Sequence, residues 1–206
     1  MSAHVSRRQK QAAATRQDIL AAARHLFATQ GYAATTMTAI AKEAQTAVQT
    51  IYDSVGPKHA IILALVDTLE DEAEVGQFRQ RIQNTAVPRE AIALFVALTR
   101  GFAERGGDII TILSSAASSE PDIAAAWQKA NANHRMGAGF VAGIIDRAGA
   151  LRPDLSLEKA GDTIGALTWG LTWQHLTGQY GWTLDECSAW MCDALYRLLL
   201  RDNEVA

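Results

Sequence analysis

Apolar side chains recur three and four residues apart along nearly the whole chain, which is the spacing of one face of an α-helix. No stretch shows the strict alternation of apolar and polar residues that is typical of a half-buried strand. The chain has 206 residues, 49% of them hydrophobic, so it is long enough to bury a substantial core. The pattern therefore predicts an all-α globular protein.

The most informative stretch lies within residues 17–58, where two short amphipathic helices follow each other. The apolar face of the first has Met37, Ile40, Ala41 and Ala44, and that of the second has Val48, Ile51 and Tyr52. Helices of this length are not stable alone. We expect support from a helix over residues 18–30, which carries its own apolar stripe and ends at Gly31-Tyr32. The three helices together predict a helix-turn-helix unit.

Breaking and capping residues divide the rest of the chain into further helices. Gly56-Pro57 predicts a new helix with Pro57 as its first residue, and Gly106-Gly107 should end the helix that begins near Pro88. Further helices are predicted from Ile109 to Ser118 behind an Asp108 cap, from Pro121 to about Gly149, from Leu157 to about Thr177 behind a Ser156 cap, and from the Thr183-x-x-Glu186 capping box to Leu200.

Composition and charge distinguish the two ends of the chain. Residues 1–14 are polar and basic without an apolar stripe, which predicts a flexible basic arm. Residues 1–60 hold seven Lys or Arg and three Asp or Glu, which gives this segment a net charge of +4. Because the whole chain has a net charge of −3, the remaining residues have a net charge of −7. This asymmetry is expected when only one end of a protein meets a polyanion. Charges scattered over the surface would give the same totals.

A set of residues at fixed offsets covers roughly the first third of the chain. The set is Thr15-Arg16-x-x-Ile19-Leu20-x-Ala22-Ala23-x-x-Leu26-Phe27, then Gly31-Tyr32-x-x-Thr35-Thr36, Ile40-Ala41, Ile51-Tyr52 and Lys58. It resembles the N-terminal domain of the TetR family of bacterial transcriptional regulators. The resemblance implies a DNA-binding domain over residues 15–60 and a helical effector-binding and dimerisation domain over residues 61–206. It also implies that two protomers bind a palindromic operator.

Two stretches depart from the family pattern. The turn carries Gln45-Thr46 where the family usually has Gly followed by an apolar residue, so a left-handed conformation there would be strained. Asp53-Ser54-Val55 replaces the common aromatic or histidine residues. Because a phosphate would repel Asp53, this side chain either points away from DNA or tunes its specificity.

The second short helix has side chains suited to the major groove of DNA. Ala47 and Val48 offer small apolar contacts, possible partners of thymine methyl groups, while Gln49 and Thr50 can reach base edges. We expect phosphate contacts from residues around this helix, namely Thr36, Thr38, Tyr52 and Lys58. Packing in the core is the alternative for Tyr52, since it lies near the buried face.

The last helix carries a broad apolar stripe, and the preceding one is apolar on two faces. In the helix with two apolar faces, one face can pack in the interior of the chain and the other against a second copy of the protein. Together with the last helix, this packing would give a symmetric four-helix homodimer interface. The residues expected at this interface are Trp190, Ala194, Leu195 and Leu198. A larger monomeric core is the alternative.

Aromatic residues on inward-facing stripes indicate where a small effector could bind. The candidates are Phe95, Phe102, Trp127, His134, Trp169 and Trp173. Most aromatic residues at helical spacing simply fill a core. However, pockets for small ligands are usually lined by apolar side chains with a few polar groups, and His134 would supply such a group. We therefore expect a largely apolar or aromatic ligand. We interpret His134 as a hydrogen-bonded core or pocket residue rather than a metal ligand.

The sequence favours a transcriptional regulator and gives little support to an enzyme. No catalytic constellation, metal site or cofactor motif is evident. Cys187 and Cys192 lack Cys-x-x-Cys spacing, and no apolar run would span a bilayer, which predicts a cytoplasmic protein with reduced thiols and no membrane contact. By the resemblance the regulator is a ligand-responsive repressor. The alternative is a helical small-molecule-binding protein or enzyme whose N-terminal domain no longer binds DNA.

Overall fold

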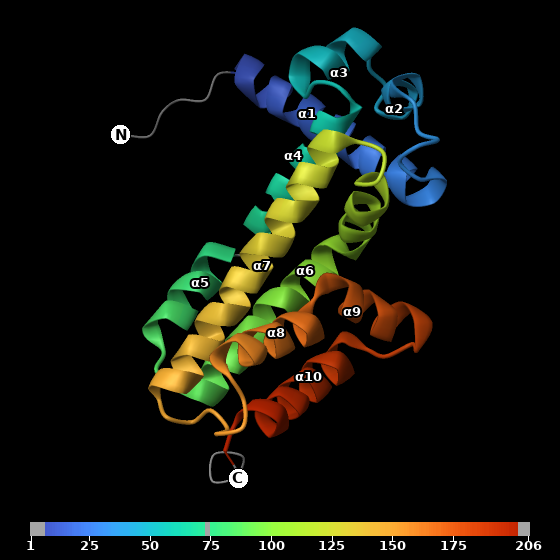
Figure 1. The fold of residues 1–206 in the computed structure, drawn as a ribbon. Helices are drawn as coiled ribbons and strands as arrows, with labels where there is room; N and C mark the ends of the chain where they lie inside the picture. Colours follow the sequence, from blue (N-terminus) through green and yellow to red (C-terminus); the bar gives the residue numbers. More distant parts are fainter. Residues whose placement is uncertain (1–6, 73–74, 202–206) are drawn as a thin grey trace. The chain divides into compact units, whose positions relative to one another are not determined.

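The computed structural model describes residues 7–72 and 75–201, which form helices and turns but no strand (Figure 1). The helices are α1 (Arg7–Gln30), α2 (Met37–Glu43), α3 (Val48–Ser54), α4 (Lys58–Glu72), α5 (Val75–Asn84), α6 (Pro88–Ala116), α7 (Pro121–Arg147), α8 (Leu157–Thr168), α9 (Gly170–Gln174), a π-helical turn (His175–Gln179) and α10 (Leu184–Leu199). The predicted all-α fold class, with a helix-turn-helix unit at the N-terminus, is confirmed.

The chain divides into two compact units. The N-terminal unit comprises residues 1–68 and 108–127, and the C-terminal unit comprises residues 69–107 and 128–206. The division runs through α4, α6 and α7 rather than through loops. The N-terminal unit therefore includes most of α4, the end of α6 and the start of α7 in addition to the three predicted helices.

Helix α1 begins earlier than the sequence pattern predicts. Residues 7–14, assigned above to a flexible arm, are its first turns. These residues are rich in alanine, glutamine, lysine and arginine, which have high helix propensity, so the helix extends beyond its buried stripe. Residues 1–6 of the predicted arm lie outside the described residues. At the other end Gly31 has φ 82°, a left-handed conformation that stops the helix as expected.

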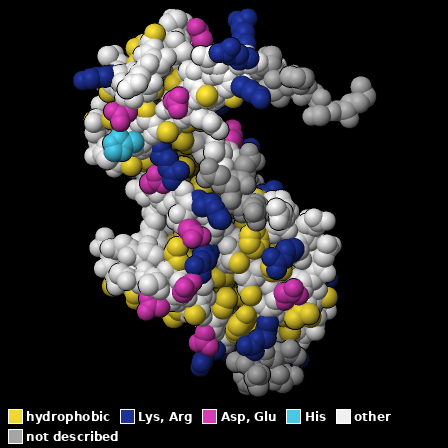
Figure 2. All heavy atoms as spheres, turned by 180° about the vertical axis from the view of Figure 1, so that it is seen from behind, with side chains coloured by type: hydrophobic (Ala, Val, Ile, Leu, Met, Phe, Trp, Pro, Cys, Tyr) yellow, Lys and Arg dark blue, Asp and Glu magenta, His cyan; other side chains and the backbone are white. Residues whose placement is uncertain are grey.

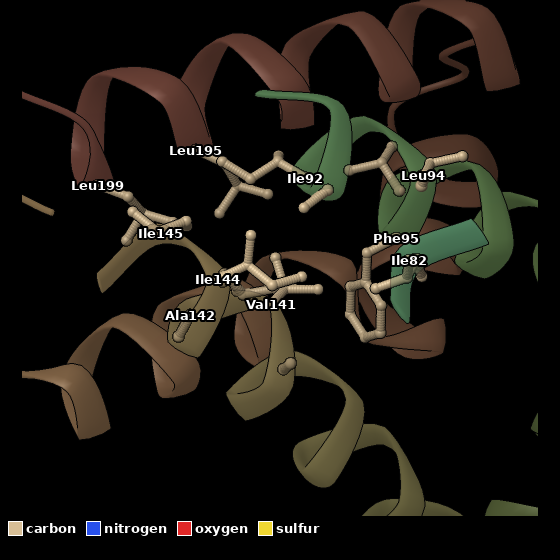
Figure 3. Packing of buried hydrophobic residues seen from close by; sticks show 14 of the residues in the cluster. Ile82, Ile92, Leu94, Phe95, Val141, Ala142, Ile144, Ile145, Leu195 and Leu199 are labelled. Atoms are coloured by element: carbon tan, nitrogen blue, oxygen red, sulfur yellow. The ribbon is translucent and has the colours of Figure 1, made fainter. Parts of the chain in front are cut away.

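The core of the C-terminal unit consists mainly of side chains from α5, α6, α7, α8, α9 and α10. In Figure 3, Leu195 of α10 points toward Ile92 of α6 and Ile144 of α7. Leu195 is completely buried within the chain. The prediction that Leu195 belongs to a dimer interface is therefore wrong, because its position in the stripe at i+4 from Met191 turns it into the chain's own core.

Several helix ends follow the sequence signals, and others do not. Ser156 caps α8, and Thr183 with Glu186 forms the predicted capping box of α10. Helix α4 begins one residue after Pro57, and α10 ends one residue before Leu200. The helix expected to reach Thr177 ends at Thr168, where Trp169 becomes extended, and continues as α9 and the π-helical turn. Helix α5 was not anticipated.

The predicted break at Gly106-Gly107 is a kink, and α6 continues to Ala116. Gly106 has non-helical dihedral angles, φ −145° and ψ 24°. A Cβ atom at this residue would lie 2.6 Å from Leu69 Cδ1 and 2.9 Å from Leu69 Cγ, so the end of α4 approaches the α6 backbone closely. The Gln174 side chain donates a hydrogen bond to the carbonyl of Gly107, next to the kink. Glycine at 106 is required for this approach rather than for an unusual φ.

The two adjacent glycines provide a matched test of the close approach. Gly106→Ala should lower the melting temperature because Leu69 must move, whereas Gly107→Ala places its Cβ in open space and should be neutral or slightly stabilising. Thermal melts of the two variants measure the difference. Equal melting temperatures would contradict the assigned contact between Gly106 and Leu69.

Candidate nucleic-acid interface

Helices α2 and α3 are joined by a four-residue connection with one strained position. Thr36 caps α2, because its Oγ1 accepts a hydrogen bond from the Ala39 N–H at 3.1 Å. After Ala44, Gln45 takes a left-handed conformation with φ 51°, and the Thr46 N–H then donates to the Ala41 carbonyl at 2.9 Å. The turn therefore keeps the geometry that glycine would adopt without strain.

The inner faces of both helices are buried. Ile40 of α2 and Ile51 of α3 have no exposed surface, and both lie in the N-terminal unit with the α1 stripe. The end of α3 has a further anchor, since Arg16 Nη1 of α1 donates to the Ser54 carbonyl at 2.7 Å. Carbonyls at a helix C-terminus lack helical partners, so this bond satisfies one of them. The orientation of α3 on α1 is thereby fixed by both packing and polar contacts.

The predicted DNA-contacting residues lie largely on the outer surface of this unit. Exposed side chains belong to Thr36, Thr38, Ala47, Gln49 and Tyr52, and half-buried ones to Val48, Thr50 and Lys58. Tyr52 is 48% exposed, so the alternative that it packs in the core is wrong. Helix α3 has only seven residues, and its exposed face presents an amide, a phenol, the carboxylate of Asp53 and small side chains. Such a surface suits hydrogen bonding to base edges and phosphates.

Lys58 has a structural role that the sequence did not reveal. Its Nζ donates to the carbonyls of Tyr32 and Thr35 at 3.0 and 3.1 Å, and it lies 4.3 Å from the centre of the Tyr32 ring. The ammonium group thus ties the start of α4 to the loop between α1 and α2. An ammonium group has three donors, so one remains for a phosphate.

An ion pair within the N-terminal unit connects α1 to α6, and a nearby carboxylate influences Tyr32 in the following loop. Arg24 of α1 forms a two-pronged ion pair with Asp108 of α6, at 2.6 and 2.7 Å. Burial raises the pKa of the Asp108 carboxyl, but the Arg24 hydrogen bond and charge outweigh it and hold that pKa below its usual value. Burial and then the Glu120 carboxylate raise the pKa of Tyr32 to about 12. Tyr32 is therefore neutral at physiological pH.

Basic side chains do not form one continuous block on the face of this unit that Figure 2 shows. In the upper part of Figure 2, Lys and Arg side chains lie at several separate places, with Asp and Glu side chains between some of them. Contacts to phosphates would depend on individual residues and backbone N–H groups rather than on a single basic patch.

Residues 19–65 match the sequence model of the family described as "Bacterial regulatory proteins, tetR family". This segment runs from the buried stripe of α1 through α2 and α3 into α4. The chain therefore carries a TetR-family N-terminal domain. No curated protein matched the sequence.

Solved structures of similar fold cover the C-terminal part of the chain as well. NalD, the secondary repressor of the MexAB-OprM multidrug efflux pump in Pseudomonas aeruginosa, has 21% identity and a TM-score of 0.76, covering 94% of this chain and 99% of its own. A putative transcriptional regulator from Saccharomonospora viridis in complex with choline has 22% identity and a TM-score of 0.74, with coverages of 92% and 99%. SmeT in complex with triclosan has 18% identity and a TM-score of 0.74, with coverages of 94% and 95%. Most of the chain, including its C-terminal part, thus has the same fold as these proteins.

The predicted effector-binding residues of this TetR-like chain fall into three groups. Phe95 and Trp173 are buried in the core of the C-terminal unit, and the Trp173 indole N–H donates to Thr99 Oγ1 at 3.3 Å. His134 has ring contacts on both sides, with centroids 5.5 Å from Phe95 and 4.9 Å from Trp169. Phe102 packs partly buried against the same core, whereas Trp127 belongs to the N-terminal unit.

His134 satisfies a carbonyl at the end of a helix. Its Nε2 lies 2.9 Å from the Gly165 carbonyl, one of the last four of α8, so Nε2 carries the proton and donates. Thr172 Oγ1 donates to the neighbouring Ala166 carbonyl in the same way. Burial lowers the pKa of His134, and the Gly165 bond only partly opposes this shift. His134 is thus a hydrogen-bonded residue in partly buried surroundings. Among the described residues, no three His, Cys, Asp or Glu side chains form a cluster that could bind a metal.

The lowered pKa of His134 predicts a pH dependence of stability. Because the folded state disfavours the protonated ring, the His134 contribution is complete above about pH 6.5 and is lost as the pH falls below that value toward the lower folded pKa. His134→Gln keeps an amide N–H for the Gly165 carbonyl but does not titrate. Chemical denaturation between pH 8 and pH 5 should show a smaller loss of unfolding free energy for the variant. An identical pH slope in both proteins would exclude this role of His134.

Proposed function

We propose that this protein is a dimeric transcriptional repressor that binds a palindromic operator and is released by a small, largely apolar ligand. The observation that carries the proposal is the outer face of α3. That face presents Gln49 and Tyr52 to solvent, while Ile51 and the Arg16–Ser54 contact hold the helix from behind. The TetR-family match over residues 19–65 supports the same assignment.

In this proposal α3 lies in the major groove. Ala47 and Val48 are small enough for close approach, and Gln49 and Thr50 reach base edges. Phosphate contacts come from Tyr52, from the hydroxyl groups of Thr36 and Thr38, and from the remaining donor of Lys58. The oxygen of Thr36 caps α2 but its O–H group stays available as a donor.

The proposed dimer uses the outer surfaces of the C-terminal helices. On α10, Trp190 is 38% exposed and Leu198 is 48% exposed, with the half-buried Ala194 between them in the stripe. Helices α8 and α10 contact each other within the C-terminal unit (Figure 1). Two copies of this pair would form a four-helix interface that covers these side chains. Leu195 lies on the inner side of α10 and takes no part.

The proposed ligand site is the aromatic surrounding of His134 in the C-terminal unit. Phe95 and Trp169 flank its ring, and its neutral imidazole is a polar group in apolar surroundings. Pockets of this composition bind small, largely apolar molecules. Similar folds were solved with choline and with triclosan, which supports a small-molecule effector without identifying it. The ligand would favour a conformation that no longer fits the operator.

Selection of bound sequences from a random DNA pool tests the function. The selected sites should be palindromic, with half-sites about 34–36 Å apart or a multiple of that distance. In a salt titration of the selected operator, Lys58→Ala should weaken binding and reduce the salt slope by about 1. A protein that enriches no DNA sequence would reject the proposal in favour of a small-molecule-binding protein without DNA binding.

Leu195 and Leu198 separate core packing from dimerisation. Leu198→Asp should leave the fold of one chain intact but shift the protein to monomers, because a charge would enter the proposed interface. Leu195→Ala should lower the free energy of unfolding by about 2–5 kcal/mol by leaving a cavity in the core. Light scattering and denaturation measure the two effects. A wild-type monomer at micromolar concentration would exclude the dimer.

A further inference from the structure

Gln49 and Asp53 form a hydrogen-bonded pair on the outer face of α3. The Gln49 Nε2 donates to Asp53 Oδ1 at 2.9 Å, and both side chains are exposed. The residues are four apart, so they lie one above the other on the helix surface. Asp53 is also the acidic residue that departs from the family pattern at the surface proposed to face DNA.

The chemistry of the pair determines which end of the amide faces Asp53. An ionised carboxylate can only accept hydrogen bonds, and in the glutamine amide only the nitrogen donates. The nitrogen must therefore be on the Asp53 side, which leaves the oxygen, Oε1, directed away from Asp53. A glutamine without this neighbour can turn its amide over and offer either group.

The orientation of the amide decides which base it can read. Adenine and cytosine present amino groups in the major groove, which donate to an oxygen, whereas guanine presents the acceptors N7 and O6 and thymine the acceptor O4. An amide free to rotate can satisfy both kinds of base, since its nitrogen donates to guanine. An amide with a fixed orientation selects bases with an amino group.

We propose that Asp53 is a specificity-positioning residue, which holds the Gln49 amide so that Oε1 faces the bases and favours an adenine or cytosine amino group over guanine. This inference rests on the proposed DNA-binding function. It also explains how a carboxylate can be compatible with a DNA-facing surface: Asp53 acts through Gln49 rather than by contacting the DNA. The charge of Asp53 lowers affinity for all sequences, and its hydrogen bond supplies discrimination in return.

A purely structural role would have a different consequence. Hydrogen-bonded side-chain pairs four residues apart stabilise a helix by only about 0.2–0.5 kcal/mol. Such a role would change the melting temperature slightly and would leave the preference for each base unchanged. The base preference at the position read by Gln49 is therefore the informative measurement.

The test compares binding-site selection by the full-length wild type, Asp53→Ala, Asp53→Asn and Gln49→Ala. Gln49→Ala identifies the base position that residue 49 reads. At that position Asp53→Ala should raise the frequency of guanine relative to adenine and cytosine about tenfold. Asp53→Asn removes the same charge and can present either an acceptor or a donor to Gln49, so it no longer fixes the amide and should relax the preference as Asp53→Ala does. Both variants should bind all sequences more tightly because one negative charge is lost.

The following results would contradict the inference. If Asp53→Asn keeps the wild-type preference, the acceptor-only carboxylate is not what fixes the amide. If Asp53→Ala changes base preference in a Gln49→Ala background, Asp53 does not act through Gln49. An unchanged profile in Asp53→Ala overturns the role of Asp53 while leaving DNA binding established. A wild-type protein that selects no DNA refutes the function on which the inference rests.

Discussion

The helix-turn-helix depends on burying the inner faces of two helices that are too short to be stable alone. Helices α2 and α3 have seven residues each, well below the length at which an isolated helix persists in water. Ile40 and Ile51 are completely buried, and full burial of such a side chain contributes about 1.5–3 kcal/mol. These two side chains and the α1 stripe therefore decide whether α3 exists as a helix at all.

Polar contacts then fix the position that apolar packing permits. The apolar contacts of α3 are not directional, so they allow small rotations of the helix. Arg16 at the Ser54 carbonyl, Lys58 at the carbonyls of the α1–α2 loop, and Arg24 at Asp108 each remove such freedom. The first two bond to backbone carbonyls that lie outside regular helical pairing, so each also satisfies an acceptor. The unit is thus specified by the combination of apolar faces and a few long basic side chains.

Sequence patterns predicted the elements of this fold better than the contacts between them. Local signals sufficed for Gly31, the Ser156 cap and the Thr183–Glu186 capping box, because each depends on residues at most three positions apart. The kink at Gly106 could be located but not interpreted, since the side chain that packs against it, Leu69, is far away in the sequence. Periodicity likewise placed Leu195 on an apolar stripe without saying whether the chain itself or a partner covers it. For the same reason, the sequence alone could not predict that Tyr52 is exposed or that Gln49 donates a hydrogen bond to Asp53.

The segment that matches the family model, residues 19–65, packs against residues from later in the chain. Ile61, Ile62 and Leu65 of α4 are buried, and so are Ile112 of α6 and Ile123 of α7, all within this unit. A chain cut at residue 60 would lose these apolar partners and the Asp108 carboxylate that pairs with Arg24. Helices α4, α6 and α7 contribute these partners from positions up to residue 127. The proposed DNA-reading surface therefore depends on residues far beyond the helix-turn-helix itself.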